Sequence, residues 1–195
     1  MALFFTTFPD DLSLRELAAF QRQLSEEIAN SEIRWKPSFK FHVTLKYLGR
    51  EDAPGRIEEI ATLAAERVQI EFASFEISLL GIGAFPDEKN PEVLWVGVKN
   101  GFPVLVQLTE SIDRSLKLEG FESEVREYRP QLTLAKAKSR TASASLSKIF
   151  TYRSDLPKTV DKMCCYRVSS FSLMRSEHTS KGSSYTLLKE FQFAC

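Results

Sequence analysis

The sequence has little of what would tie it to a disulfide framework, a metal centre or a membrane. It has only three cysteines in 195 residues, and two of them, Cys164 and Cys165, are adjacent. An odd count with one adjacent pair is not a disulfide framework, and neighbours on a strand point to opposite faces and so make poor joint metal ligands. No apolar run approaches the roughly 20 residues of a membrane span, and the N-terminus lacks a signal-peptide pattern. We therefore expect a protein of a reducing cytoplasm.

The sequence also lacks net charge, with 26 basic and 26 acidic residues, although 43% hydrophobic content allows a sizeable core. The cations are unevenly placed, because five surround each of two short segments. These are Arg34, Lys36, Lys40, Lys46 and Arg50 around the first, and Arg126, Arg129, Lys136, Lys138 and Arg140 around the second. Cations gathered at a candidate site suit an anionic ligand. Ordinary solvated strand ends are the alternative interpretation.

Histidine is scarce as well, and one of the two histidines lies in the first of these segments. The segment 41–49 alternates apolar and polar residues and carries His42 and Thr44 two residues apart. Residues i and i+2 of a strand point to the same face, so this pair faces away from the core that Val43 and Leu45 enter. The segment 129–136 has the same pattern, with Gln131 in the place of the histidine and Thr133 in the place of the threonine.

The remaining periodicities indicate alternating strands and amphipathic helices. We expect strands at 2–7, 33–35, 41–47, 72–82, 93–98, 131–136, 160–174 and 185–193, and helices at roughly 13–29, 54–68, 103–118 and 139–150. Asp11 or Ser13 is the expected N-cap of the first helix. Polar loops are expected around Gly81 and Gly83 and at 176–184.

The two halves of the chain follow one order: motif strand, helix, long strand, loop and closing strand. Roughly fifty residues separate His42 from Trp95, and roughly fifty separate Gln131 from Tyr185. Short connections favour antiparallel pairing with helices on the outer faces. We expect an α+β fold of two pseudo-symmetric lobes of mostly antiparallel sheet, with an active cleft between them. Residues 1–195 would form one bilobal domain with motifs at 42–44 and 131–133.

In this order the chain resembles the two-histidine (2H) phosphoesterases, specifically the LigT-like RNA 2′,3′-cyclic phosphodiesterases. The resemblance runs over nearly the whole chain and rests on five segments. They are Arg34-Trp35, His42-Val43-Thr44-Leu45 through Leu48-Gly49, Gly83-Ala84-Phe85-Pro86, Val93-Leu94-Trp95-Val96-Gly97-Val98, and Arg129 to Lys136 apart from Gln131.

The resemblance implies a hydrolase that opens 2′,3′-cyclic phosphates on RNA ends or nucleotides without a metal or another cofactor. Histidine suits proton transfer because its pKa lies near neutrality. His42 would be a general acid or a general base, and the sequence does not decide which. Thr44 and Thr133 would donate hydrogen bonds to phosphate oxygens. Lys136 stands where the family often has arginine, so it keeps the charge but loses the bidentate fork.

Two further residues are assigned to the substrate by the resemblance. Tyr47 falls at the aromatic position where a base stacks, although packing within the strand is an equally good explanation. Arg129 is assigned to substrate binding. The expected partners are RNA ends or nucleotides with a cyclic or terminal phosphate, the expected state is a monomer, and no membrane association is expected.

Gln131 is the departure from the family pattern. A glutamine amide can hydrogen-bond a phosphate but cannot transfer a proton at neutral pH, and loss of a general acid or base removes about 10²–10⁴-fold of rate. Gln131 is therefore a replacement in an otherwise normal enzyme, the mark of a slow one-histidine enzyme, or the mark of a nucleotide-binding module. His178, the other histidine, is expected in a surface loop; a role as replacement proton carrier is the alternative.

Overall fold

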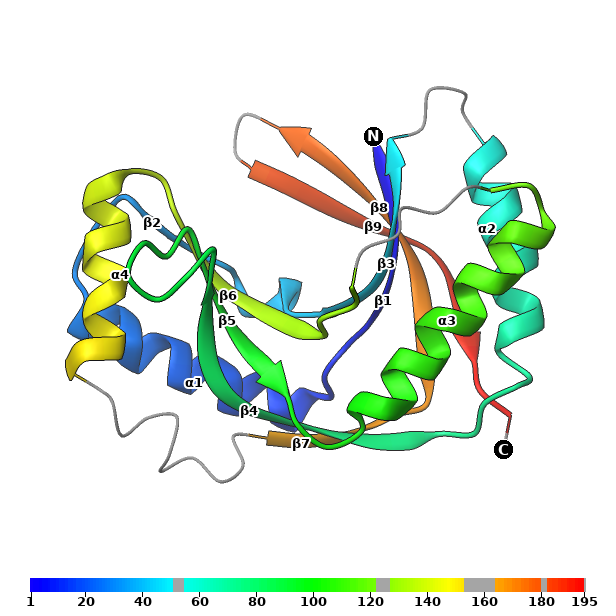
Figure 1. The fold of residues 1–195 in the computed structure, drawn as a ribbon, viewed down its shortest axis with the longest axis horizontal. Coiled ribbons are helices and arrows are strands. Elements are labelled where there is room, and N and C mark those ends of the chain that lie inside the picture. The colour runs from blue at the N-terminus through cyan, green and yellow to red at the C-terminus, as the bar shows by residue number, and fades with distance from the viewer. Residues whose placement is uncertain (51–54, 122–126, 153–163, 180–181, 195) are drawn as a thin grey trace.

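The computed structural model describes residues 1–194 apart from 51–54, 122–126, 153–163 and 180–181. The described strands are β1 (Ala2–Thr7), β2 (Ile33–Trp35), β3 (Val43–Arg50), β4 (Phe75–Phe85), β5 (Val93–Val98), β6 (Gln131–Ala137), β7 (Cys164–Val168), β8 (Ser170–Thr179) and β9 (Gly182–Gln192). The described α-helices are α1 (Asp11–Glu27), α2 (Arg56–Val68), α3 (Phe102–Leu118) and α4 (Arg140–Tyr152), and a 3₁₀ turn spans Ser38–Lys40 (Figure 1).

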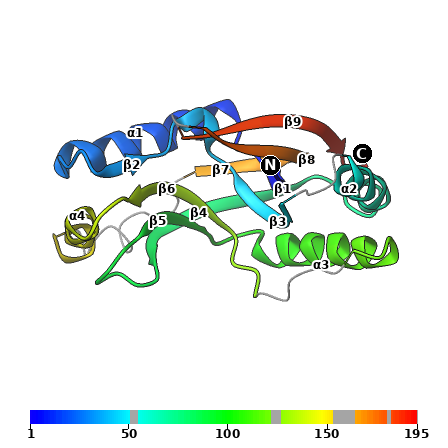
Figure 2. The same cartoon turned by 90° about the horizontal axis from the view of Figure 1, so that it is seen from above.

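In the described part of the chain, one antiparallel sheet has the order β7-β4-β5-β6-β3-β1-β8-β9, with β2 paired to β6. The two motif strands, β3 and β6, are neighbours at its centre, where Val43 lies opposite Leu132. Seen from above, β8 and β9 lie on one side of this centre and β4 and β5 on the other (Figure 2). The α+β class with antiparallel sheet and outer helices is confirmed.

The sheet and helices divide into two lobes that meet at β3 and β6. The His42 lobe contains β1, β3, β8 and β9 with α2 and α3, and the Gln131 lobe contains β2, β4, β5, β6 and β7 with α1 and α4. The succession β1-α1-β3-α2-β4 is matched by β5-α3-β6-α4-β8. The halves interleave in space, because β5 pairs with the second motif strand and β4 pairs with β5, while β8 and β9 join the lobe of the first.

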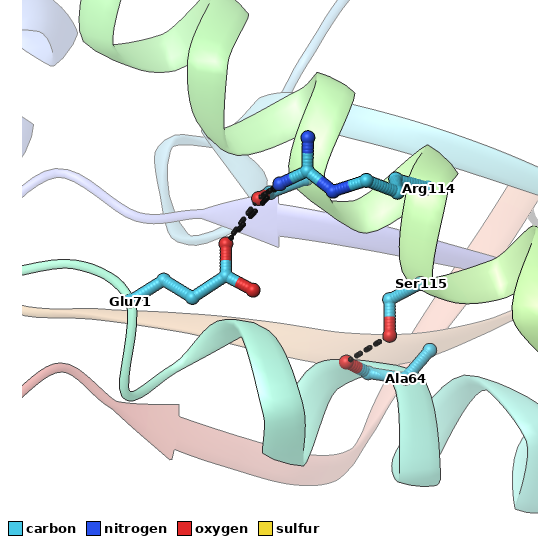
Figure 3. Close-up of polar contacts among 5 residues, drawn as sticks. Ala64, Glu71, Arg114 and Ser115 are labelled. Atoms are coloured by element: carbon cyan, nitrogen blue, oxygen red, sulfur yellow. Dashed lines mark hydrogen bonds and ion pairs between the residues drawn. The ribbon is translucent and has the colours of Figure 1, made fainter.

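Helix packing follows from small side chains and caps. The N-cap of α1 is Asp10, one residue before the expected position, and its carboxylate accepts a hydrogen bond from the backbone of Ser13 at 2.8 Å. The face that α2 turns to α3 is rich in buried alanine, which lets the two helices approach closely. Ser115 on α3 donates to the carbonyl of Ala64 on α2 at 3.1 Å, and this bond fixes the contact (Figure 3).

Two expectations about the C-terminal third are wrong. Residues 176–179 and 182–184 belong to the paired strands β8 and β9 rather than to a loop, with Ser176 opposite Tyr185 and His178 opposite Ser183. The two strands are held together by backbone hydrogen bonds, which do not depend on the side chains. A paired strand can therefore be polar on both faces, and its sequence then lacks the hydrophobic alternation that predicts a strand. The expected single strand at 160–174 is divided between β7 and β8 at Ser169, and its first residues, 160–163, lie outside the described part.

β4 continues through the glycines that were expected to mark a loop. A Cβ at Gly83 would lie 2.2 Å from the ring of Trp95 on the paired strand, so the indole occupies the space of a missing side chain. Glycine inside a strand marks such close approaches. The described part contains no helix long and apolar enough to cross a membrane.

Candidate functional site

A cavity of about 780 Å³ lies where the two motif strands face helix α3. Its lining comes from β3 and the residue before it, from β6 and the segment before it, and from one side of α3. The lining residues are His42, Thr44, Leu45, Lys46, Tyr47, Phe102, Val106, Thr109, Glu110, Asp113, Glu127, Tyr128, Arg129, Gln131 and Thr133.

The four motif side chains meet in this cavity. Val43 and Leu132 are fully buried and face each other across the strands. Continued in antiparallel register, this pairing places Thr44 beside Gln131 on the opposite face of the sheet. His42 and Thr133 lie beside each other by the same register, and all four line the cavity. The shared face expected from the i, i+2 spacing is therefore confirmed for both segments.

Both motif strands carry the same irregularity directly after the threonine. The pairing of β3 with β1 skips Leu45, and the pairing of β6 with β5 skips Leu134. Such bulges re-aim the side chains that follow them and are frequent beside active sites. After the first bulge, both Lys46 and Tyr47 reach the cavity, although neighbours on a regular strand would face opposite ways.

His42 is buried, with 7% of its surface exposed, and its ring has a defined orientation. Nδ1 lies 2.9 Å from the carbonyl oxygen of Lys40. A carbonyl can only accept, so Nδ1 carries the hydrogen and Nε2 keeps a lone pair. The rings of Phe4 and Tyr185 pack around the imidazole at centroid distances of 5.3 and 5.4 Å. Burial, followed by the charge of Lys36, lowers the pKa of His42 to about 3, so the imidazole is neutral near pH 7.

The cations inside the cavity are paired with acids. Lys46 lies 2.8 Å from Asp113 on α3. Arg129 lies 2.7 Å from Glu127, and its side chain is 65% exposed at the cavity rim. Glu110 on α3 adds a third carboxylate to the lining. Of the described cations that cluster in the sequence, only Lys46 and Arg129 therefore line the cavity. Arg126 lies outside the described residues.

Other cations gather directly beside His42. The Nζ of Lys36 lies 3.4 Å from His42 Nδ1. Burial, followed by the charges of Lys136 and Lys40, lowers the pKa of Lys36 to about 8. Lys136 is thus close enough to act on Lys36, and it lies opposite Arg34 in the β2–β6 pairing. Lys136 was expected to bind phosphate, but it does not line the cavity and lies to one side of the motif residues.

Tyr47 is 54% exposed at the rim, where its ring is available to a ligand. The wall that α3 contributes is not predicted by the apolar stripe of this helix, because the lining residues lie beside that stripe. Phe102, Val106, Thr109 and Asp113 recur at helical spacing beside that stripe, which was a usable signal. His178 is on β8 rather than in the expected loop; its alternative role, as a replacement proton carrier, is not tested by the fold. Within the described residues no group of three or more His, Cys, Asp or Glu could hold a metal ion.

The fold and this site define a two-lobed α+β protein with two related strand motifs facing one cleft. Residues 40–170 match the family model of the 2′-5′ RNA ligase superfamily, and the chain belongs to this family. The resemblance to 2H phosphoesterases seen in the sequence is thereby confirmed.

Known proteins are similar to this chain over most of its length, one in sequence and two in fold. An RNA 2′,3′-cyclic phosphodiesterase of Aeropyrum pernix is 32% identical over 88% of this chain and 94% of its own. The crystal structure of TT0787 of Thermus thermophilus has a TM-score of 0.76 at 22% identity and covers 99% of this chain and 98% of its own. E. coli LigT complexed with 3′-AMP has a TM-score of 0.71 at 20% identity and covers 100% and 98%.

Proposed function

We propose that this protein hydrolyses 2′,3′-cyclic phosphates on RNA ends or nucleotides by metal-independent general acid/base chemistry, at a rate limited by Gln131. The observation that carries the proposal is the convergence of His42, Thr44, Gln131 and Thr133 in one cavity. The names of its relatives support the same reaction. The proposal further takes the protein to be a cytoplasmic monomer in which residues 1–195 act as one bilobal domain.

His42 is the general base in this proposal. Its Nδ1 donates to the Lys40 carbonyl, so the lone pair of Nε2 is free to take a proton from water. The depressed pKa keeps His42 in the required neutral form before the substrate binds. A bound anionic phosphate then favours the imidazolium that forms, which raises the pKa of His42 in the complex and makes it a stronger base.

Water attacks phosphorus as His42 removes its proton, and the bond from phosphorus to one ribose oxygen breaks. The Thr44 and Thr133 hydroxyls donate to the non-bridging phosphate oxygens. The amide of Gln131 donates to the phosphate or to the departing oxygen, but the proton that completes the ribose hydroxyl comes from solvent. Lys136 supplies positive charge beside the site.

The outer residues bind the nucleoside. Tyr47 offers an exposed ring for a base at the cavity rim. Arg129 exchanges its exposed pairing with Glu127 for a contact with the substrate; such exposed pairs contribute about 0–1 kcal/mol, so the exchange costs little.

The test is hydrolysis of 2′,3′-cyclic AMP in the presence of a metal chelator, followed by separation of the nucleotide products. His42→Ala should lower turnover by about 10²–10⁴-fold. His178→Ala is the matched control, because it removes the only other histidine and should leave the rate unchanged. Turnover by the unaltered protein no higher than that of His42→Ala, together with retained nucleotide binding, would replace the proposal by the nucleotide-binding module.

A further inference from the structure

Charge is unevenly distributed around the cleft. On the α3 side the lining holds Glu110 and Asp113, and Glu127 lies at the rim. The two cations of the lining, Lys46 and Arg129, are each paired with one of these acids. A polyanionic chain leaving the phosphate site on this side would meet paired cations and an additional carboxylate.

The opposite side, beyond His42, is strongly basic. Lys36 and Lys40 lie over the ring of Tyr185, each with Nζ 5.7 Å from the centroid. Lys136 acts on Lys36 from strand β6. Within the described part of the chain, none of these three lysines makes an ion pair, and Lys40 donates only to the carbonyl of Ser183, at 2.6 Å.

This arrangement is unfavourable without an anion. Lys36 is half-buried and has two like charges as neighbours, and both conditions disfavour its charged form. A phosphate placed among the three ammonium groups would remove the repulsion and gain charge-assisted hydrogen bonds. The lysine cluster of Lys36, Lys40 and Lys136 therefore has the chemistry of a phosphate contact that is separate from the cavity lining.

The basic surface continues along β6 away from the cleft. A second cavity of about 590 Å³ lies at the start of α4, and its lining includes Lys89, Lys138 and Arg140 against one acid, Glu92. At about 3.3 Å per strand residue, Lys138 lies roughly 17 Å along the chain from Thr133. With an axial rise of about 3.4 Å per nucleotide in a stacked strand, this distance corresponds to on the order of five nucleotides.

We propose that an RNA strand leaves the phosphate site on the His42 side, passes over Tyr185 and the lysine cluster, and follows β6 to the cavity at α4. The protein would then prefer oligoribonucleotides with a cyclic 3′ end over cyclic mononucleotides. This inference rests on the proposed function and specifies its substrate. Tyr185 holds the ammonium groups of Lys36 and Lys40 over its ring, and the lysines neutralise backbone phosphates.

The experiment compares kcat/KM for a cyclic mononucleotide and for oligoribonucleotides of two to ten residues that end in a 2′,3′-cyclic phosphate. We expect kcat/KM to rise with length and to level off near five or six nucleotides. Lys40→Gln should reduce the advantage of a dinucleotide or longer substrate by roughly tenfold, the size of a charged hydrogen bond. Lys138→Gln/Arg140→Gln should reduce only the advantage of substrates of about five residues or more.

Lys117→Gln is the matched control, because this exposed lysine lies in the last turn of α3, in the helix that forms the acidic wall. Lys117→Gln should leave the length dependence of kcat/KM unchanged. Each phosphate contact that the other variants lose should instead lower the slope of log(kcat/KM) against log[salt] by about 0.7. Equal kcat/KM for all lengths, or a length dependence that Lys40→Gln and Lys138→Gln/Arg140→Gln leave intact, would overturn the inference.

A binding measurement separates this inference from the proposed function. Fluorescence anisotropy with a labelled hexaribonucleotide that ends in a 3′-phosphate needs no turnover. If catalysis is absent but Lys40→Gln weakens hexamer binding and Lys117→Gln does not, the strand path stands and the proposed reaction fails. If cyclic mononucleotides are hydrolysed but the hexamer binds no more tightly than 3′-AMP, the reaction stands and the strand path fails.

Discussion

Gln131→His should convert a one-histidine site into a site with two proton-transfer groups. Gln131 is half-buried and lines a cavity of about 780 Å³, so an imidazole can replace the amide without displacing core residues. It would stand beside Thr44 and Thr133 in the cavity that His42 also lines. A general acid typically contributes about 10²–10⁴-fold, which corresponds to roughly 3–5 kcal/mol of transition-state stabilisation. We expect kcat for a cyclic nucleotide to rise by this factor.

The pH dependence identifies the origin of the gain. An introduced acid must be protonated, so at an ordinary histidine pKa near 6.5 the gain should shrink as pH rises above about 6.5. The unaltered protein should lack this limb, because the pKa of its His42 is held at about 3 and glutamine does not titrate. Lys36, with a pKa of about 8, faces His42 in both proteins, so the ratio of the two rates removes its contribution.

The assay measures hydrolysis of a 2′,3′-cyclic nucleotide between pH 5 and 9, with chelator present. Gln131→Asn is the matched control, since it keeps the amide and adds no proton carrier. The variant Gln131→His/His42→Ala should lose most of the gain, because the acid then works without its base. A folded Gln131→His protein within threefold of the unaltered rate would refute the two-group reasoning, as would a gain that survives loss of His42.

Two further predictions concern stability. Gly83→Ala should lower the free energy of unfolding by about 1–3 kcal/mol, because its Cβ would meet the Trp95 ring; chemical denaturation should show a smaller loss when Trp95→Leu is present, and equal losses in both backgrounds would contradict the packing argument. Because the folded pKa of His42 lies below the unfolded value of 6.5, its stabilising contribution is present above pH 6.5 and declines as pH falls towards 3. Between pH 7 and pH 4 the unaltered protein should therefore lose roughly 3 kcal/mol more than His42→Gln, and parallel pH curves of unfolding free energy would contradict the depressed pKa.

The motif geometry was readable from the sequence because it depends on local alternation. Val43 and Leu132 enter the core, so the polar neighbours of each had to share the opposite face. The bulges after Thr44 and Thr133 could not be predicted from the sequence, because a shift in register depends on the partner strand. This is why Tyr47 could be assigned to the site only by resemblance.

Charge placement shows a second limit of sequence reasoning. The clustered cations are close in the sequence, but β3 and β6 pair at Val43 and Leu132, and this central pairing does not bring the cations further along each segment together. Lys46 therefore pairs with Asp113 on a helix far along the chain, while Lys138 reaches a different cavity. The opposing acids Glu110 and Asp113 come from α3, and only the fold brings them to the cleft.

The asymmetry of the site indicates which half of the reaction Gln131 weakens. Burial among the aromatic rings and the charge of Lys36 keep His42 neutral and outweigh the hydrogen bond to the Lys40 carbonyl, which favours the protonated ring. A neutral imidazole whose Nδ1 donates to that carbonyl has its Nε2 lone pair free, which suits a base and not an acid. Attack by water therefore retains its catalyst. The departing ribose oxygen instead faces an amide that can donate a hydrogen bond but cannot give up a proton. The slow step expected of this protein is the protonation of that oxygen, and Gln131→His addresses this step while His42→Ala addresses the other.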